Sequence, residues 1–190
     1  MSRFFWVRHG PTHAKAMVGW TDLPADLSDT ALLSRVHDHL PAEALVISSD
    51  LQRAVTTADA IAGDRERLPH DAGLREIHFG DWEMQTFDEV EDANHIRAFW
   101  ETPGDVAPPQ GESWNALSTR VDAVANRLMS QHPGRDIVAV AHFGAILSQV
   151  QKALQIDPYA AFAHKIDNLS VTELHWQDQR WRAASINQNL

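Results

Sequence analysis

A chain of 190 residues, 44% hydrophobic and 22% charged, is long enough for one globular domain with a sizeable core. Its formal net charge of -10 argues against nucleic acid or an anionic membrane surface as the main partner, so any anion site needs a local cluster of positive charge. The absence of cysteine excludes disulfides, thiolate metal sites and cysteine nucleophiles. With no apolar run of ~20 residues and no signal-peptide pattern, we expect a cytoplasmic protein.

The first part of the chain predicts two strands, each followed by a helix. Bulky apolar runs without a helical period indicate the strands, and apolar residues at helical spacing indicate the helices. Ser49 or Asp50 would be the N-cap of the second helix. In chain order we predict a strand at 3–7, a helix at 27–40, a strand at 44–50 and a helix at 51–62.

The rest of the chain predicts a cap followed by a third strand, a helix and a last strand pair. A segment rich in Pro and Gly, at about 83–111, indicates a helix and loop that cover one sheet edge. The alternation of strands and helices favours an α/β fold: a three-layer α/β/α sandwich with a mainly parallel sheet. The cap is then a short insertion within a single domain that spans 1–190. The further elements are a strand at 136–142, a helix at 144–154 and strands at 168–176 and 180–186.

Basic side chains follow each of the three best strands. Arg8 and His9 end the first strand, Arg53 lies one helical turn after the second, and His142 ends the third. The carboxyl ends of parallel strands share one edge of the sheet, where open α/β folds bind their ligands. Two arginines and two histidines at one place predict a pocket for a small dianion such as phosphate, because the guanidinium fork matches phosphate oxygens.

Each of these residues alone has an ordinary explanation. Arg8 would simply end a strand, Arg53 would lie on a solvated helix face, and His142 would be a hydrogen-bonded core histidine. Their shared position at successive strand ends is what favours a common site.

The motifs that surround these residues resemble one known family. The segments "VRHGPT", "VISSDLQRAVTTA", "LREIHFGDWE", "PPQGES" and "VAHFGAI" occur in the order and approximate spacing of the histidine phosphatase superfamily, which also contains the cofactor-dependent phosphoglycerate mutases. The resemblance runs from residue 4 to about 148. "NLSVTEL" is still similar to the family's late strand.

The resemblance implies a role for each residue of the predicted pocket. His9 would attack phosphorus and carry the phosphoryl group, while Arg8, Arg53 and His142 would bind the phosphate oxygens. Glu76, from "LREIHFG", would protonate the leaving oxygen and later serve as base for water. The scheme needs no metal and no cofactor.

Physical chemistry supports this assignment independently of the family. Imidazole is a nucleophile only when one nitrogen is unprotonated, and neighbouring arginines favour that neutral form of His9. A backbone carbonyl near Gly10 is a candidate acceptor for the other ring nitrogen, and Gly10 lets the backbone pass close to a ligand. Glu83 is the rival acid to Glu76, and we interpret it as a residue that makes structural hydrogen bonds.

Four positions raise the question of substrate identity. Pro11 replaces the usual Glu or Gln of the family and removes an N–H. Lys15 stands where the family tends to carry Asn, so it either contacts phosphate or a second acidic group, or is a solvated loop lysine. Phe143 replaces a usual glycine and narrows the pocket. Trp20 lies in a segment that flanks the pocket, as part of an aromatic rim or of the core. We count Gly10, Lys15, Trp20 and Phe143 as candidate substrate-binding residues.

The sequence therefore predicts a metal-independent phosphomonoesterase that acts through a phosphohistidine on a small phosphorylated metabolite. An α-ribazole phosphate and a sugar phosphate are both compatible with the motifs. A phosphoglycerate mutase is the first alternative, disfavoured because the cap is short, and a non-catalytic phosphate binder is the second. Nucleic acid and membranes are not expected partners, whereas a homodimer stays open.

Overall fold

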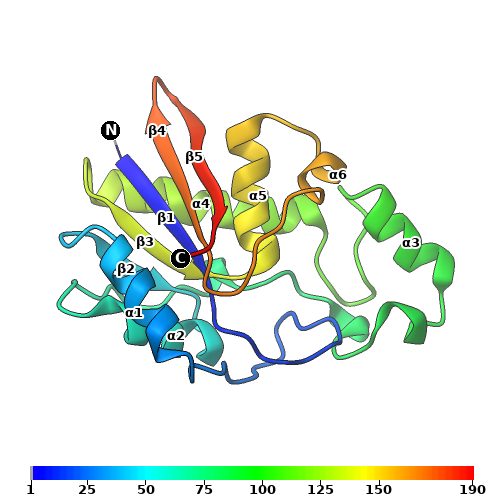
Figure 1. Cartoon of the computed structure of the whole chain (residues 1–190). Coiled ribbons are helices and arrows are strands. Elements are labelled where there is room, and N and C mark those ends of the chain that lie inside the picture. Colours follow the sequence, from blue (N-terminus) through cyan, green and yellow to red (C-terminus); the bar gives the residue numbers. More distant parts are fainter. Residues whose placement is uncertain (1) are drawn as a thin grey trace.

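Five strands form one mixed sheet in the computed structural model, which describes residues 2–190 (Figure 1). The first three strands are parallel to one another, and the last two continue the sheet as an antiparallel pair. The predicted α/β fold is confirmed: the sheet is mixed, and four of its five strands run in the same direction. From edge to edge its order is β2 (Leu45–Ser48), β3 (Ile137–Ala141), β1 (Ser2–Arg8), β4 (Val171–Gln177) and β5 (Arg180–Gln188).

Successive side chains of the central strands enter two different cores. In β1, Phe4 and Trp6 pack with the helices of one face, while Phe5 and Val7 pack with those of the other. Helices α1 (Thr30–His39) and α2 (Gln52–Ala62) cover one face, and α4 (Trp114–Gln131) and α5 (Phe143–Leu154) cover the opposite face (Figure 1). The sheet is thus buried on both sides, as its continuous apolar strands require.

The first helix has a side-chain N-cap, whereas the second has none. The side chain of Asp29 accepts a hydrogen bond from the Leu32 amide at 2.9 Å and caps α1. The predicted cap of α2 is wrong, because the N-cap residue is Leu51 and makes no side-chain bond. Asp50 instead forms a bidentate pair with Arg75, at 2.7 and 2.6 Å.

The predicted cap segment contains a short 3₁₀ helix, η3 (Phe87–Glu89), and helix α3 (Ala93–Glu101), followed by a loop. Ile96 and Phe99 of α3 are buried in the same apolar cluster as the sheet. The cap segment therefore shares the hydrophobic core with the sheet. Helix α6 (Pro158–Ala161) and the 3₁₀ helices η1 (Ala72–Leu74) and η2 (Gly80–Trp82) complete the fold. No helix in the described part is long and apolar enough to cross a bilayer.

The carboxyl end of β1 is held from both sides. The His9 amide donates to the Ala141 carbonyl at 3.0 Å, and the Leu169 amide donates to the Arg8 carbonyl at 2.9 Å. The Asn168 side chain also donates to the His9 carbonyl, at 2.8 Å. These bonds fix the backbone from which Arg8 and His9 project.

Candidate active site

His9 is held in one tautomer. Its Nδ1 donates to the Gly10 carbonyl at 2.6 Å, because a carbonyl oxygen can only accept. Its Nε2 accepts from Arg53 Nε at 3.3 Å and therefore carries the lone pair. The carbonyl contact that we expected near Gly10 is present, and it leaves Nε2 as the nucleophilic atom.

The ring of His9 is neutral at ordinary pH. Burial and the nearby charges of Arg53 and Arg8 lower the pKa of His9 to about 3, against the opposing effect of the bond to Gly10. The side chain therefore stays in the form that can attack an electrophile throughout the neutral range.

Backbone carbonyls anchor the two arginines without neutralising them. Arg53 is 1% exposed and donates to the carbonyls of Thr21 and Gly19 at 2.9 and 2.7 Å. Arg8 donates to the Ile166 carbonyl at 2.6 Å, and its guanidinium lies 5.5 Å from the centroid of the Phe143 ring. Two oriented positive charges thus face the cavity beside His9.

His142 lies beside His9 at the end of β3, with 5.0 Å between the two ring centroids. Its side chain is fully buried, and within residues 2–190 neither ring nitrogen has a hydrogen-bond partner. Burial, followed by His9 and Arg53, holds the pKa of His142 well below its usual value. Leaving a buried polar group unpaired is costly, so these nitrogens favour a ligand that can bond to them.

Glu76 completes the group from another part of the chain. Both carboxyl oxygens lie 3.0 Å from the amide nitrogen of Gly144 at the start of α5, and the Ile77 amide donates to Oε1 at 2.9 Å. Burial raises the pKa of Glu76, although these amides and the two arginines oppose the shift. A Cβ at position 144 would lie 2.5 Å from Glu76 Oε1, so the site requires glycine there.

Two side chains from different elements hold the backbone of Glu76. Trp20 Nε1 and Arg120 Nη2 each donate to the Glu76 carbonyl at 2.8 Å. Arg120, in α4, is also paired with Glu112 at 2.8 Å. No sequence pattern indicates this role for Arg120, because an arginine within an amphipathic helix usually faces solvent.

Glu83 forms structural hydrogen bonds, as we interpreted from the sequence. Its carboxylate accepts from the amides of Gly19, Trp20 and Thr21 at 3.0, 2.7 and 3.3 Å. It also accepts from the Thr21 hydroxyl at 2.8 Å and the Phe79 amide at 3.1 Å. Arg53 binds carbonyls of the same loop, so the loop 19–21 is clamped between Glu83 and Arg53.

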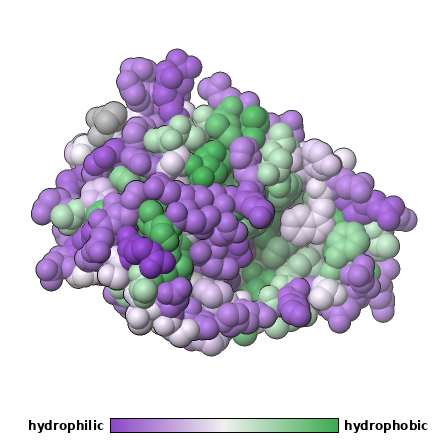
Figure 2. All heavy atoms as spheres, in the orientation of Figure 1, coloured by the Kyte–Doolittle hydropathy of each residue, from purple (hydrophilic) through white to green (hydrophobic). Residues whose placement is uncertain are grey.

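Four of the five residues predicted to be catalytic line one cleft of about 230 Å³. Figure 2 shows this face hollowed beside the region of α3, with apolar residues at the bottom of the hollow. The fifth, His142, is fully buried beside the His9 ring and is not among the lining residues. Arg8, His9, Arg53, Glu76 and Phe143 are among the residues that line the cleft.

Three further candidates are not brought into the lining. Lys15 is exposed, and the Trp20 indole is bonded to the Glu76 backbone. Gly10 is also outside the lining, and a Cβ there would lie 2.6 Å from Leu27 Cδ2 and 3.1 Å from the Asp26 carbonyl oxygen. Across residues 2–190, no group of three or more His, Asp or Glu side chains is arranged to hold a metal ion.

The chain belongs to the histidine phosphatase superfamily, branch 1, whose family model matches residues 4–189. It is 28% identical to the adenosylcobalamin/alpha-ribazole phosphatase of Escherichia coli K12, over 99% of this chain and 92% of that protein. It is 34% identical to phosphoglycerate mutase-like protein 4 of Arabidopsis thaliana, over 92% and 82%. It is also 37% identical to the glucosyl-3-phosphoglycerate phosphatase of Mycolicibacterium vanbaalenii, over 76% and 70%. Among solved structures, Bacillus stearothermophilus YhfR superposes with a TM-score of 0.90 at 25% identity, covering 99% of this chain and 98% of YhfR.

Proposed function

We propose that the protein is a phosphomonoesterase that works through a phosphohistidine at His9. The observation that carries this proposal is the fixed tautomer of His9. Nδ1 is bonded to the Gly10 carbonyl, so Nε2 carries the lone pair, which accepts a long bond of 3.3 Å from Arg53 in a residue that lines the cleft. A neutral imidazole next to two guanidiniums attracts a phosphate and can attack it.

The reaction proceeds in two steps. Arg8, Arg53 and His142 hold the nonbridging oxygens, and His9 Nε2 forms a bond to phosphorus as the bond from phosphorus to the alcohol oxygen breaks. Burial raises the pKa of Glu76 and so favours its protonated form, which transfers its proton to that oxygen. Water then attacks the phosphohistidine and gives a proton to Glu76, so the products are the alcohol and inorganic phosphate. The scheme uses no metal ion.

A mutase-type phosphotransferase is the second candidate, because it shares the first step and a mutase-like relative covers most of the chain. It differs in returning the phosphoryl group to a second hydroxyl in place of water. Formation of 2-phosphoglycerate from 3-phosphoglycerate, without release of phosphate, would favour it.

The test is phosphate release with EDTA present throughout. The substrates are p-nitrophenyl phosphate and a panel of sugar, nucleotide, glycerate and α-ribazole phosphates. We expect wild-type turnover, loss of turnover in His9→Ala, and normal turnover in His132→Ala, a histidine at the end of α4. A phosphorylated protein trapped under alkaline conditions, present in wild type and absent in His9→Ala, would support the intermediate. Turnover that survives in His9→Ala would overturn the proposal.

A further inference from the structure

Much of the lining of the cleft is apolar. Residues of the loop after β1 form one wall, and rings from η2, α3 and α5 or their flanks form others. The apolar part of the lining includes Ala14, Ala16, Met17, Phe79, Trp100 and Phe143. The Phe143 ring also lies 5.5 Å from the Arg8 guanidinium, so apolar surface begins directly beside the phosphate-binding residues.

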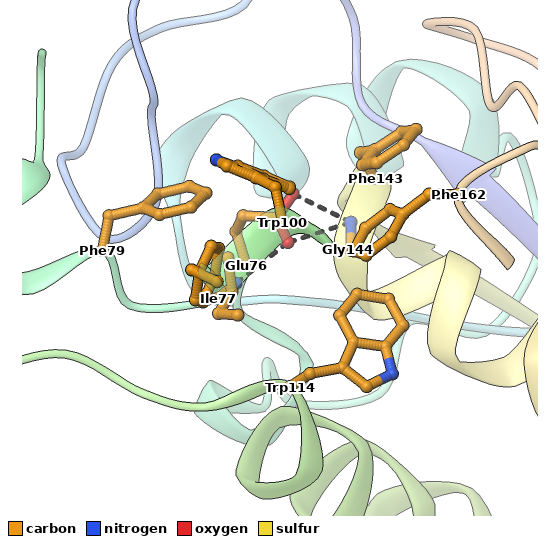
Figure 3. Close-up of a pocket in the computed structure, with 9 residues that line it drawn as sticks. Glu76, Ile77, Phe79, Trp100, Trp114, Phe143, Gly144 and Phe162 are labelled. Carbon is orange, nitrogen blue, oxygen red and sulfur yellow. Dashed lines mark hydrogen bonds between the residues drawn. The ribbon is translucent and has the colours of Figure 1, made fainter. Parts of the chain in front are cut away.

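A second, smaller cavity of about 30 Å³, here called the recess, adjoins the cleft. It shares Glu76, Phe79, Trp100 and Phe143 with the cleft, and reaches further to Phe99 and Phe162. Figure 3 shows the rings of Phe79, Trp100, Phe143 and Phe162 grouped around the Glu76 carboxyl, with dashed lines from the carboxyl oxygens to Gly144. The carboxyl of Glu76 is the one titratable group in the lining of this recess.

The position of Glu76 fixes where the alcohol must lie. When Glu76 protonates the leaving oxygen, the two oxygens are within hydrogen-bond distance. The first carbons of the alcohol are then at the mouth of the recess, in contact with the rings. The alcohol is therefore bound by apolar surface and not by a polar shell.

The charged residues of the lining also favour an uncharged alcohol. Its cationic side chains are Arg8 and Arg53, both placed for the phosphate, and the nearby Lys15 is exposed and outside the lining. A carboxylate on the alcohol would lose its hydration shell and gain no cationic partner, and this desolvation is strongly unfavourable. Each apolar methylene that enters the recess favours binding by about fourfold.

We propose that the protein hydrolyses phosphate monoesters of uncharged, apolar alcohols, alkyl or ring-bearing, which Phe79, Trp100 and Phe143 select against esters that carry a carboxylate. This inference rests on the phosphomonoesterase activity proposed above. It adds the class of substrate that the same site accepts.

The first test compares kcat/KM of the wild type for four primary esters: benzyl, propyl and glycerol phosphates and 3-phosphoglycerate. Their leaving groups are all alkoxides, so the comparison reports on recognition more than on intrinsic reactivity. We expect benzyl phosphate to exceed glycerol phosphate by about 10- to 100-fold, with 3-phosphoglycerate lower still. His9-dependent turnover in which 3-phosphoglycerate equals or exceeds benzyl phosphate would overturn this inference and leave the phosphatase intact. No His9-dependent turnover of any ester, p-nitrophenyl phosphate included, would overturn both.

Variants of one ring provide the second test. Trp100→Ala should lower the benzyl-to-glycerol ratio about tenfold, and Trp100→Lys should lower it further while raising the relative rate with 3-phosphoglycerate. Phe87→Ala is the matched control, because Phe87 is an exposed cap ring outside both cavities. The benzyl-to-glycerol ratio of this variant should equal that of the wild type. A rise in melting temperature with inorganic phosphate shows that each variant is folded. An unchanged ratio in folded Trp100→Ala would count against selection by the rings.

Discussion

At the scale of single residues, burial shifts the pKa values of the proposed nucleophile, His9, and the proposed proton donor, Glu76, in opposite directions. His9 and Glu76 are both buried, and burial disfavours the charged form of each. The pKa of His9 therefore falls and that of Glu76 rises. Burial therefore favours the neutral form of both side chains, which is the form that a nucleophilic imidazole and a proton donor require.

The proton-donor role of Glu76 predicts a dependence on the leaving group. Glu76→Gln should lower kcat/KM for alkyl phosphates by about 10²–10⁴-fold, because an alkoxide leaves poorly without a proton. The loss should be much smaller for p-nitrophenyl phosphate, whose phenolate leaves unaided. Steady-state kinetics on both esters, with the exposed Glu91→Gln as control, measure the difference. Equal losses on both esters would show that Glu76 acts in some other way.

The neutral state of His9 predicts a pH dependence of stability. The folded-state pKa of His9 is about 3, below its unfolded value of 6.5, so the unfolded chain binds more protons between these values. This contribution to stability is complete above pH 6.5 and is lost as the pH falls toward 3. In urea unfolding, His9→Gln should flatten the acid-side slope by up to about 1.4 kcal/mol per pH unit. His132→Gln should keep the wild-type slope, and a parallel curve for His9→Gln would contradict the prediction.

At the scale of elements, the start of α5 holds the proton donor. The Gly144 amide contacts both oxygens of Glu76, and the absence of a Cβ at position 144 makes that approach possible. Glycine normally destabilises a helix by about 0.5–1 kcal/mol relative to alanine. The contact with Glu76 is a structural reason for its presence here.

Gly144→Ala should therefore damage catalysis although it suits a helix. The new Cβ would lie 2.5 Å from Glu76 Oε1 and 3.3 Å from Leu117 Cδ2, so the carboxyl must move. We expect kcat for alkyl phosphates to fall at least tenfold, measured beside the unfolding free energy. Gly104→Ala is the control, since the nearest atom to a Cβ there is 3.8 Å away. A Gly144→Ala protein with wild-type kcat would mean that the position of Glu76 is not critical.

The loop 19–21 links the phosphate side of the site to the acid side. Glu83 binds its amides, Arg53 binds two of its carbonyls, and the Trp20 indole reaches the Glu76 carbonyl. One short segment thus contacts both Arg53, on the phosphate side of the site, and Glu76, on the acid side. Trp20, predicted to contact substrate, acts in the structure through Glu76.

Glu83→Gln should consequently affect both stability and phosphate binding. A glutamine side chain offers one acceptor oxygen and turns a donor toward the backbone amides, which leaves buried N–H groups unpaired. We expect the unfolding free energy to fall by about 2 kcal/mol or more, and the inorganic phosphate Kd to rise because Arg53 loses its support. Urea unfolding and calorimetric titration, with Glu91→Gln as control, measure the two effects. A stability loss without any change in phosphate affinity would argue against the link through the loop.

At the scale of the whole molecule, features that follow from local sequence patterns could be predicted, whereas features that depend on contacts between distant segments could not. Strand periodicity and the shared edge of parallel strands were enough to group Arg8, His9 and Arg53. The mixed sheet was harder to predict, because β4 and β5 have the same apolar character whichever way they run. The Glu76 supports, Gly144 and Arg120, were missed because their contacts join segments that no local pattern connects.

The central position of β1 has a consequence for how the chain is made. Phe4 pairs with Ile137 on one side and Leu174 on the other, so both partners of the first strand are synthesised late. At elongation rates of about 5–20 residues per second, the apolar strand is synthesised roughly ten seconds before its neighbours exist. Such distant pairing slows folding and leaves an aggregation-prone strand exposed in the meantime. The nascent chain should therefore depend on shielding during synthesis, even though the finished protein buries Phe4, Phe5, Trp6 and Val7 of that strand.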